Sequence, residues 1–98
     1  MVIVTEPTIE HEDEGARGRF FLRRGGERCG SLDYTVGEGV VHIEYVEVSP
    51  AARGTGLGRH LVAAAVQWAR DTNRKVVPIC SYAGMVLRRD SSMHDVLA

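Results

Sequence analysis

A strand that runs through a glycine-rich turn into a helix is the feature that most limits the possible folds of this chain. Residues 40–48 are rich in Val, Ile and Tyr and predict a β-strand. In residues 58–71, apolar and small side chains recur with helical spacing. Between the two lies the segment Arg53-Gly54-Thr55-Gly56-Leu57-Gly58. The sequence therefore predicts a strand, a tight turn and a helix joined as one unit.

This turn predicts a binding site for an anion. The first N–H groups of a helix have no partner within it, and glycine has no Cβ to keep a phosphate away. Two common phosphate motifs do not fit. A P-loop needs Gly-Lys-Ser/Thr, where this chain has Gly58-Arg59-His60, and the dinucleotide motif needs a glycine where Arg59 stands.

The turn instead follows the pattern Arg-x-x-Gly-x-Gly. It is preceded by Val48-Ser49-Pro50 and followed, after the helix, by Lys75-Val76-Val77-Pro78-Ile79-Cys80. In these segments the sequence resembles the GNAT superfamily of N-acetyltransferases, and within it a subgroup of very short single-domain members with a Val-Val-Pro-x-Cys strand. The resemblance covers about residues 26–89. The chain departs from those short relatives at Asp90-Ser91-Ser92-Met93, where they carry a His-Pro-Glu-Tyr-like end.

The resemblance implies that the chain binds acetyl-CoA. It implies that the backbone of Val46 and Val48 pairs with the pantetheine amides. It also implies that the pyrophosphate lies against the turn, at Arg53, Gly54, Thr55, Gly56, Leu57, Gly58, Arg59 and His60.

Three residues are candidates for the chemistry of acetyl transfer. Glu47 is expected to take a proton from an attacking amine, although it could be a solvated edge charge. Cys80 could accept the acetyl group in a two-step mechanism or could be a small buried side chain. Tyr82 could protonate the leaving thiolate or could anchor the core.

The expected fold is α/β (α+β), in one domain over residues 1–98. It has a GNAT-like mixed, mainly antiparallel sheet, one long helix after the turn and a short helix over residues 82–89. Residues 1–5 predict a strand, and residues 10–18 a mobile loop. Residues 20–23 and 31–36 predict a hairpin around Gly25-Gly26, and residues 37–39 a second turn. The strand at residues 75–80 is expected to lose its neighbour at Pro78.

Side-chain periodicity predicts which residues face the core. Alternation along the strand places Val41, Ile43 and Tyr45 on one face and brings Glu47 onto the same face. A β-bulge near Val46 or Glu47 would reset this register. In the helix, one apolar arc gathers Leu57, Leu61, Val62, Ala64, Ala65, Trp68 and Ala69.

Composition excludes several classes of protein. The net charge of −1 and the pI of about 6.4 argue against a nucleic-acid or anionic-membrane surface. No apolar run approaches the length of a membrane span, and the acidic segment at residues 10–14 is unlike a signal peptide, so we expect a cytoplasmic protein. The two cysteines and four histidines are dispersed, which predicts free thiols and no metal site.

The resemblance implies an acetyl-CoA-dependent acyltransferase, an N-acetyltransferase of the GNAT type, which acts on an unidentified amine of a protein, a peptide or a small polyamine. The alternative is a non-catalytic module that binds or senses acyl-CoA. A third possibility is an interaction domain whose turn binds another phosphate. The basic pairs Arg23-Arg24 and Arg88-Arg89 are either solvated or near the nucleotide 3′-phosphate. A monomer or a weak dimer is expected.

Overall fold

A computed structural model describes residues 7–98, which form one five-stranded sheet and its helices. The strands follow the order of the chain across the sheet, and every neighbouring pair is antiparallel except β4 and β5, which are parallel. Their bounds are β1 (Thr8–Asp13), β2 (Arg17–Arg24), β3 (Glu27–Gly37), β4 (Val40–Val48) and β5 (Lys75–Pro78). The expected mixed, mainly antiparallel sheet is confirmed.

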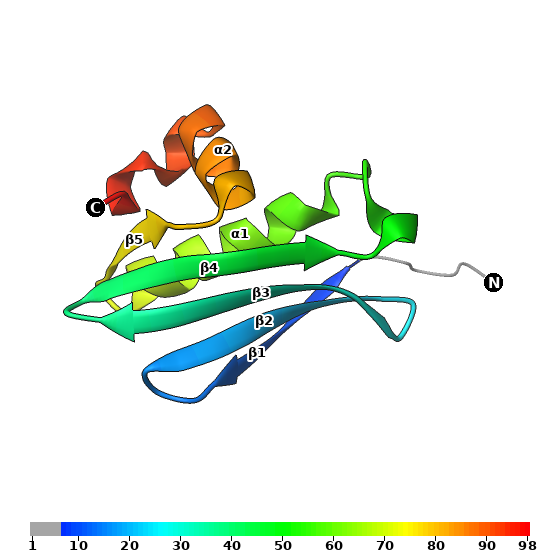
Figure 1. Ribbon diagram of the computed structural model, residues 1–98, viewed down its shortest axis with the longest axis horizontal. Helices are drawn as coiled ribbons and strands as arrows, with labels where there is room; N and C mark the ends of the chain where they lie inside the picture. Colours follow the sequence, from blue (N-terminus) through cyan, green and yellow to red (C-terminus); the bar gives the residue numbers. More distant parts are fainter. Residues whose placement is uncertain (1–6) are drawn as a thin grey trace.

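The helices lie on one side of this sheet and at its β5 end. The long helix α1 (Leu57–Asp71) packs across one face, against β2, β3, β4 and β5 (Figure 1). The 3-10 helix η1 (Pro50–Ala52) precedes it, and α2 (Ser81–Arg89) and η2 (Ser91–Val96) follow β5. In the part of the chain that the structure describes, no helix covers the opposite face of the sheet.

The core lies between α1 and the covered face of the sheet. Large apolar side chains from β2, β3 and β4 meet the helix there, among them Leu22, Leu32 and Ile43, none of which is exposed. The predicted apolar arc of α1 is confirmed for most of its members. Ala64 and Trp68 are only half-buried, and Val66, which the arc omitted, is buried.

The predicted bulge exists in β4, but it lies closer to the start of the strand. In the pairing of β3 with β4, Tyr34 faces Ile43 and Asp33 faces Tyr45, so Glu44 is the extra residue. The prediction that Tyr45 shares a face with Val41 and Ile43 is therefore wrong, because the bulge comes before it. Tyr45 is 53% exposed, while Ile43 is fully buried.

The prediction of a loop over residues 10–18 is wrong for most of its length. Residues 10–13 belong to β1 and residues 17–18 to β2, and the two strands pair in register from Thr8 opposite Arg23 to Asp13 opposite Gly18. The sequence did not predict this strand, because it is an edge strand that faces solvent. Its side chains are mostly charged, so the usual alternation of apolar and polar residues is missing. The strand predicted for residues 1–5 lies outside the described residues.

The remaining elements agree with the sequence. The hairpin around Gly25-Gly26 and the turn before β4 are present, and β5 pairs with β4 only as far as Pro78. The C-terminal helix starts at Ser81, one residue earlier than predicted, and the last residues form η2.

A buried tyrosine gives the fold a specific pH dependence. Tyr34 is 1% exposed, and its hydroxyl is 2.6 Å from Nε2 of His11. Burial raises the pKa of Tyr34 to about 12, so the folded chain holds the phenol proton after the unfolded chain has lost it. The free energy of unfolding should therefore fall by about 2–3 kcal/mol between pH 10 and pH 12.

This expectation is tested by chemical denaturation of Tyr34→Phe and of the unsubstituted chain across that pH range. The extra loss of stability should disappear in Tyr34→Phe. It should persist in Tyr45→Phe, which changes an exposed tyrosine. Equal slopes for the unsubstituted chain and Tyr34→Phe would contradict the role given to Tyr34.

Candidate functional site

The site begins where β4 and β5 separate. Their parallel pairing ends with Ile43 opposite Pro78, and the next two N–H groups of the chain, those of Ile79 and Cys80, both donate to the Ile43 carbonyl at 2.9 and 3.0 Å. From Glu44 onwards, β4 pairs with β3 on one side only. The other edge of β4 therefore has backbone groups that can bind a ligand as an added strand would.

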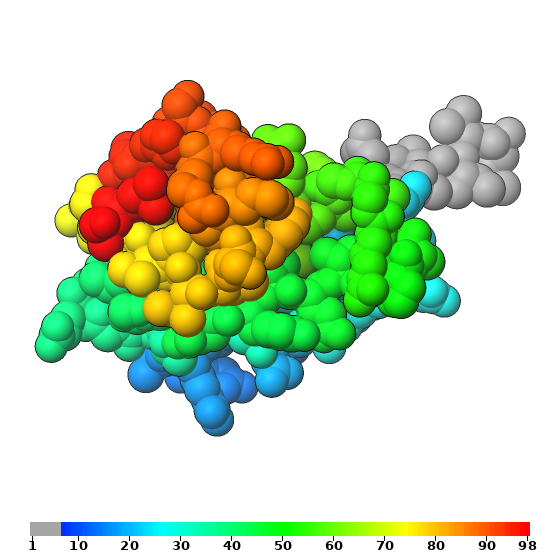
Figure 2. All heavy atoms as spheres, turned by 45° about the horizontal axis from the view of Figure 1, so that its top comes forward, coloured from blue at the N-terminus to red at the C-terminus, as the bar shows by residue number. Residues whose placement is uncertain are grey.

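A groove of about 330 Å³ follows this free edge to the start of α1. The end of β4 and the turn after it form one wall, and Tyr82 of α2 contributes to the lining; Figure 2 shows the turn (green) and α2 (orange) on the same side of the molecule. The lining consists of Tyr45, Val46, Glu47, Val48, Ala52, Arg53, Gly54, Gly56, Leu57, Gly58 and Tyr82. We call this the transfer groove. It brings together Val46, Val48 and most of the predicted turn.

The turn has a conformation that glycine allows. Gly54 and Gly56 have φ angles of +77° and +78°, in the left-handed region, and both are exposed. Arg53 fixes the turn to β4, because its Nε donates to the carbonyl of Val48 at 3.1 Å. The arginine is thus placed at the groove by a bond to the same strand whose edge lines it.

The N-terminus of α1 is the second part of the candidate site. Gly56 is its N-cap, no side chain of residues 7–98 caps the helix, and the first turn contains no acidic residue. The unpaired N–H groups and the positive end of the helix dipole therefore remain available to a phosphate at the end of the groove. The residues present fit a pyrophosphate.

Three predicted pyrophosphate residues do not line the transfer groove. The hydroxyl of Thr55 donates to the carbonyl of Ala52, so this side chain closes the turn. Beyond Gly56 lie two adjoining hollows, a larger one of about 490 Å³ and a smaller one of about 270 Å³, and Asp90 lines both. Arg59 lines both hollows, and His60 lines the smaller one. These two residues could therefore contact a pyrophosphate in the transfer groove only through their backbone groups. Their side chains could reach only a ligand that extends past Gly56.

Asp90 changes the charge of these hollows. Its carboxylate lies 3.6 Å from the guanidinium of Arg59 and accepts bonds from the N–H and hydroxyl of Ser92, at 3.0 and 2.6 Å. The bonds from Ser92 hold the pKa of Asp90 below its usual value. Arg89 also lines the larger hollow, whereas Arg23, on β2, pairs with Glu10 of β1. Of the two basic pairs, only Arg88-Arg89 is near the site.

Tyr82 connects the transfer groove to the larger hollow, which it also lines. It lies over Gly58, where an added Cβ would be 2.6 Å from the tyrosine hydroxyl. Gly58 is therefore required for this packing. Burial raises the pKa of Tyr82, and the nearby charge of Arg59 partly opposes the shift. The phenol keeps its proton at neutral pH and can donate it.

Glu47 lies on the lip of the transfer groove. It is exposed, and it stands opposite Ser31 in the register of β3 and β4. No cation among residues 7–98 forms an ion pair with it. The carboxylate can therefore receive a proton from a molecule in the groove, directly or through water.

Cys80 does not line the transfer groove. It is the N-cap residue of α2, it is half-buried, and its neighbours belong to the core. Sequence reasoning also missed two lining residues, Tyr45 and Ala52. The bulge at Glu44 determines the position of Tyr45, and no pattern in the sequence located that bulge at this residue.

Among residues 7–98, no three side chains are grouped in a way that would hold a metal ion. Within the same range, none of the helices has both the length and the apolar character needed to cross a membrane.

Known structures with the same fold include enzymes and candidate enzymes of acetyl transfer. A GCN5-like protein from Staphylococcus aureus is 26% identical, with a TM-score of 0.69 over 91% of this chain and 87% of that one. A candidate acyl-CoA N-acyltransferase from Klebsiella pneumoniae is 25% identical, with a TM-score of 0.62 over 76% of this chain and 55% of that one. The chain spans about half the length of several larger structures that it matches (43%, 53% and 55%).

A likeness of fold alone extends to a candidate streptothricin acetyltransferase from Bacillus anthracis, solved in complex with acetyl coenzyme A. It is 20% identical, with a TM-score of 0.61 over 67% of this chain and 39% of that one. No curated protein sequence matches the chain. The family model of GCN5-related N-acetyltransferases matches residues 19–96, which include the whole transfer groove. The chain therefore belongs to the GCN5-related N-acetyltransferase (GNAT) family.

Proposed function

We propose that the protein transfers an acetyl group from acetyl-CoA to an amine. The observation that carries this proposal is the transfer groove, which joins a free strand edge to an uncapped helix N-terminus. A strand edge suits the amides of pantetheine, and the helix N-terminus suits a pyrophosphate. Acetyl-CoA contains both groups in one chain. The strand at Lys75–Pro78 and Cys80 further support a place in the short Val-Val-Pro-x-Cys subgroup.

Direct transfer is the mechanism that the geometry supports best. Glu47 accepts a proton as the amine attacks the thioester carbonyl, and a backbone N–H of β4 near Val48 stabilises the oxyanion that forms. The new C–N bond replaces the C–S bond, and Tyr82 donates its phenol proton to the departing thiolate. Both side chains line the same groove, which supports these paired roles.

A covalent intermediate at Cys80 receives less support. Its attack would require the thiolate to reach the thioester, and its side chain packs against the core beside the groove. We therefore assign Cys80 a packing role at the start of α2.

The substitution Glu47→Gln tests this mechanism. It should lower kcat by about 100-fold or more, because the amide cannot take the proton. The dissociation constant for acetyl-CoA should stay the same, since the groove keeps its shape. Release of free CoA thiol in the presence of spermidine measures the rate, and calorimetric titration with acetyl-CoA measures the affinity.

Cys80→Ala is the informative companion variant. It should keep its turnover, and intact-mass analysis of the unsubstituted protein after incubation with acetyl-CoA should show no acetyl adduct on Cys80. A stable adduct there, together with lost turnover in Cys80→Ala, would favour the two-step mechanism. Binding of acetyl-CoA without turnover by the unsubstituted chain would favour the non-catalytic module.

A further inference from the structure

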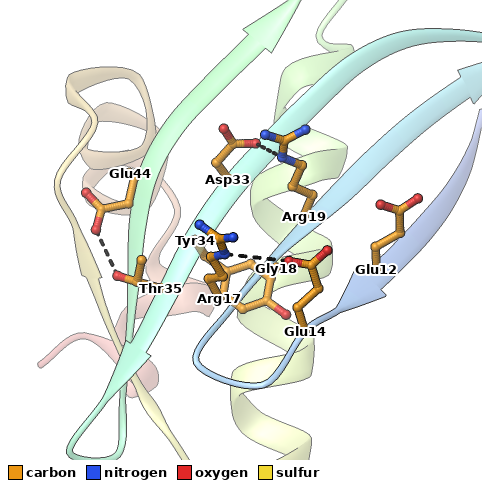
Figure 3. A pocket seen from close by; sticks show the side chains of 9 residues that line it. All are labelled: Glu12, Glu14, Arg17, Gly18, Arg19, Asp33, Tyr34, Thr35 and Glu44. Carbon is orange, nitrogen blue, oxygen red and sulfur yellow. Dashed lines mark hydrogen bonds and ion pairs between the residues drawn. The ribbon is translucent and has the colours of Figure 1, made fainter.

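The uncovered face of the sheet contains a second concave site, separate from the transfer groove. It is a hollow of about 450 Å³ over β1, β2, β3 and β4, and Figure 3 shows its side chains with α1 behind the strands. We call it the sheet-face hollow. Six of its nine lining residues are charged: Glu12, Glu14, Arg17, Arg19, Asp33 and Glu44.

The two arginines of the sheet-face hollow are already paired. Nε of Arg17 lies 3.6 Å from a carboxylate oxygen of Glu14, and Nε of Arg19 lies 3.2 Å from one of Asp33. Figure 3 marks both pairs. Four carboxylates face two lining guanidiniums and the guanidinium of Arg28 beside Glu12, which leaves one negative charge in excess. It therefore favours a cationic ligand.

Glu44 is the lining carboxylate without a cationic partner among residues 7–98. Its only hydrogen bond within that range is from the hydroxyl of Thr35, at 2.8 Å. The other carboxylate outside the two pairs, that of Glu12, lies 3.3 Å from the guanidinium of Arg28. A cation that enters the hollow would therefore gain the most binding free energy by pairing with the Glu44 carboxylate.

The sheet-face hollow and the transfer groove share no lining residue, but on β4 they are lined by consecutive residues. Glu44 is the extra residue and lines the hollow, and the next residue, Tyr45, lines the groove. Glu47, on the same strand, also lines the groove. A molecule that is held at Glu44 is therefore within a few residues of the proposed base.

We propose that the sheet-face hollow holds the acceptor, and that the acceptor carries at least two amines. One amine stays protonated and pairs with Glu44, while another reaches the transfer groove as the nucleophile. This inference rests on the proposed acetyl transfer. Polyamines and lysine-rich peptides share the required chemistry, a flexible alkyl chain with spaced ammonium groups.

Steady-state kinetics of Glu44→Gln at saturating acetyl-CoA test this proposal. The KM for spermidine should rise about two- to fivefold with little change in kcat, because the variant loses one exposed charge pair and no group of the chemistry. The KM for propylamine, which has a single amine, should not change. Glu27→Gln, at the far end of the β2–β3 hairpin, is the matched control and should behave as the unsubstituted chain. A peptide with two adjacent lysines forms the second arm, and the lower KM identifies the source of the amine.

Direct binding separates this inference from the proposed function. In an NMR titration with spermidine in the absence of acetyl-CoA, the amides of Thr35 and Glu44 should shift, and the shifts should be lost in Glu44→Gln. An unchanged KM for spermidine together with unaltered shifts in Glu44→Gln would overturn the inference, even if acetyl-CoA is bound and turned over. Failure to bind acetyl-CoA would instead overturn the proposed function.

Discussion

Gly56→Glu should abolish most of the affinity for acetyl-CoA and leave the protein folded. The new carboxylate would stand at the N-cap of α1, where the pyrophosphate is proposed to bind, and would occupy the same N–H groups. We expect the dissociation constant to rise by about 100-fold or more. An added Cβ at Gly56 meets no atom within 4 Å, so the cost to folding should be the backbone strain of about 1–2 kcal/mol. Calorimetric titration and chemical denaturation measure the two effects.

Gly39→Glu is the matched control for this experiment. Gly39 has a φ angle of +76°, close to the +78° of Gly56, and its added Cβ also meets nothing within 4 Å. It lies in the turn before β4, at the opposite end of that strand from the transfer groove. The two variants should lose similar stability, and only Gly56→Glu should lose acetyl-CoA. Similar affinities in both variants would refute the placement of the pyrophosphate.

Gly18→Ala should cause the largest loss of stability of any glycine-to-alanine change in the strands of this sheet. An added Cβ would lie 2.5 Å from the backbone carbonyl oxygen of Glu12 and 2.6 Å from Cζ of Tyr34, and it would also strike the tyrosine hydroxyl. The carbonyl belongs to β1 and cannot turn away without disturbing the pairing of β1 with β2. We expect a loss of about 3 kcal/mol in the free energy of unfolding.

Gly37→Ala provides the comparison, because an added Cβ at this strand glycine meets nothing within 4 Å. It should be neutral or slightly stabilising. Combining Gly18→Ala with Tyr34→Phe should recover part of the loss, since the hydroxyl is one of the obstructing groups and the Glu12 carbonyl remains. If Gly18→Ala were as stable as Gly37→Ala in urea denaturation, the close packing at this point would be wrong.

The strand, turn and helix of the transfer groove could be predicted because local rules determine them. The β-branched run predicts the strand β4, and the glycines, which take positive φ angles, predict the turn. The helical spacing after Gly58 predicts α1. The end of β5 pairing at Pro78 follows from the missing N–H of proline. These elements carry most of the predicted binding residues.

Other features depend on contacts between segments that are far apart in the chain. Local sequence patterns carry no information about such contacts. The bulge at Glu44 is set by how β4 meets β3, so the sequence indicated a bulge and misplaced it. The edge strand β1 has too few apolar residues for a clear alternation. Arg59 pairs with Asp90, which lies far along the chain, where the sequence departs from the short relatives it resembles.

The most direct test of acetyl-CoA binding in the transfer groove is an NMR titration of the isotopically labelled chain with acetyl-CoA. The amides of Val46, Val48 and residues 54–60 should shift together and saturate, and those of Gly37 and Gly39, at the opposite end of β4, should not move. Shifts confined to the uncovered face of the sheet, or no saturable shifts at all, would contradict the account.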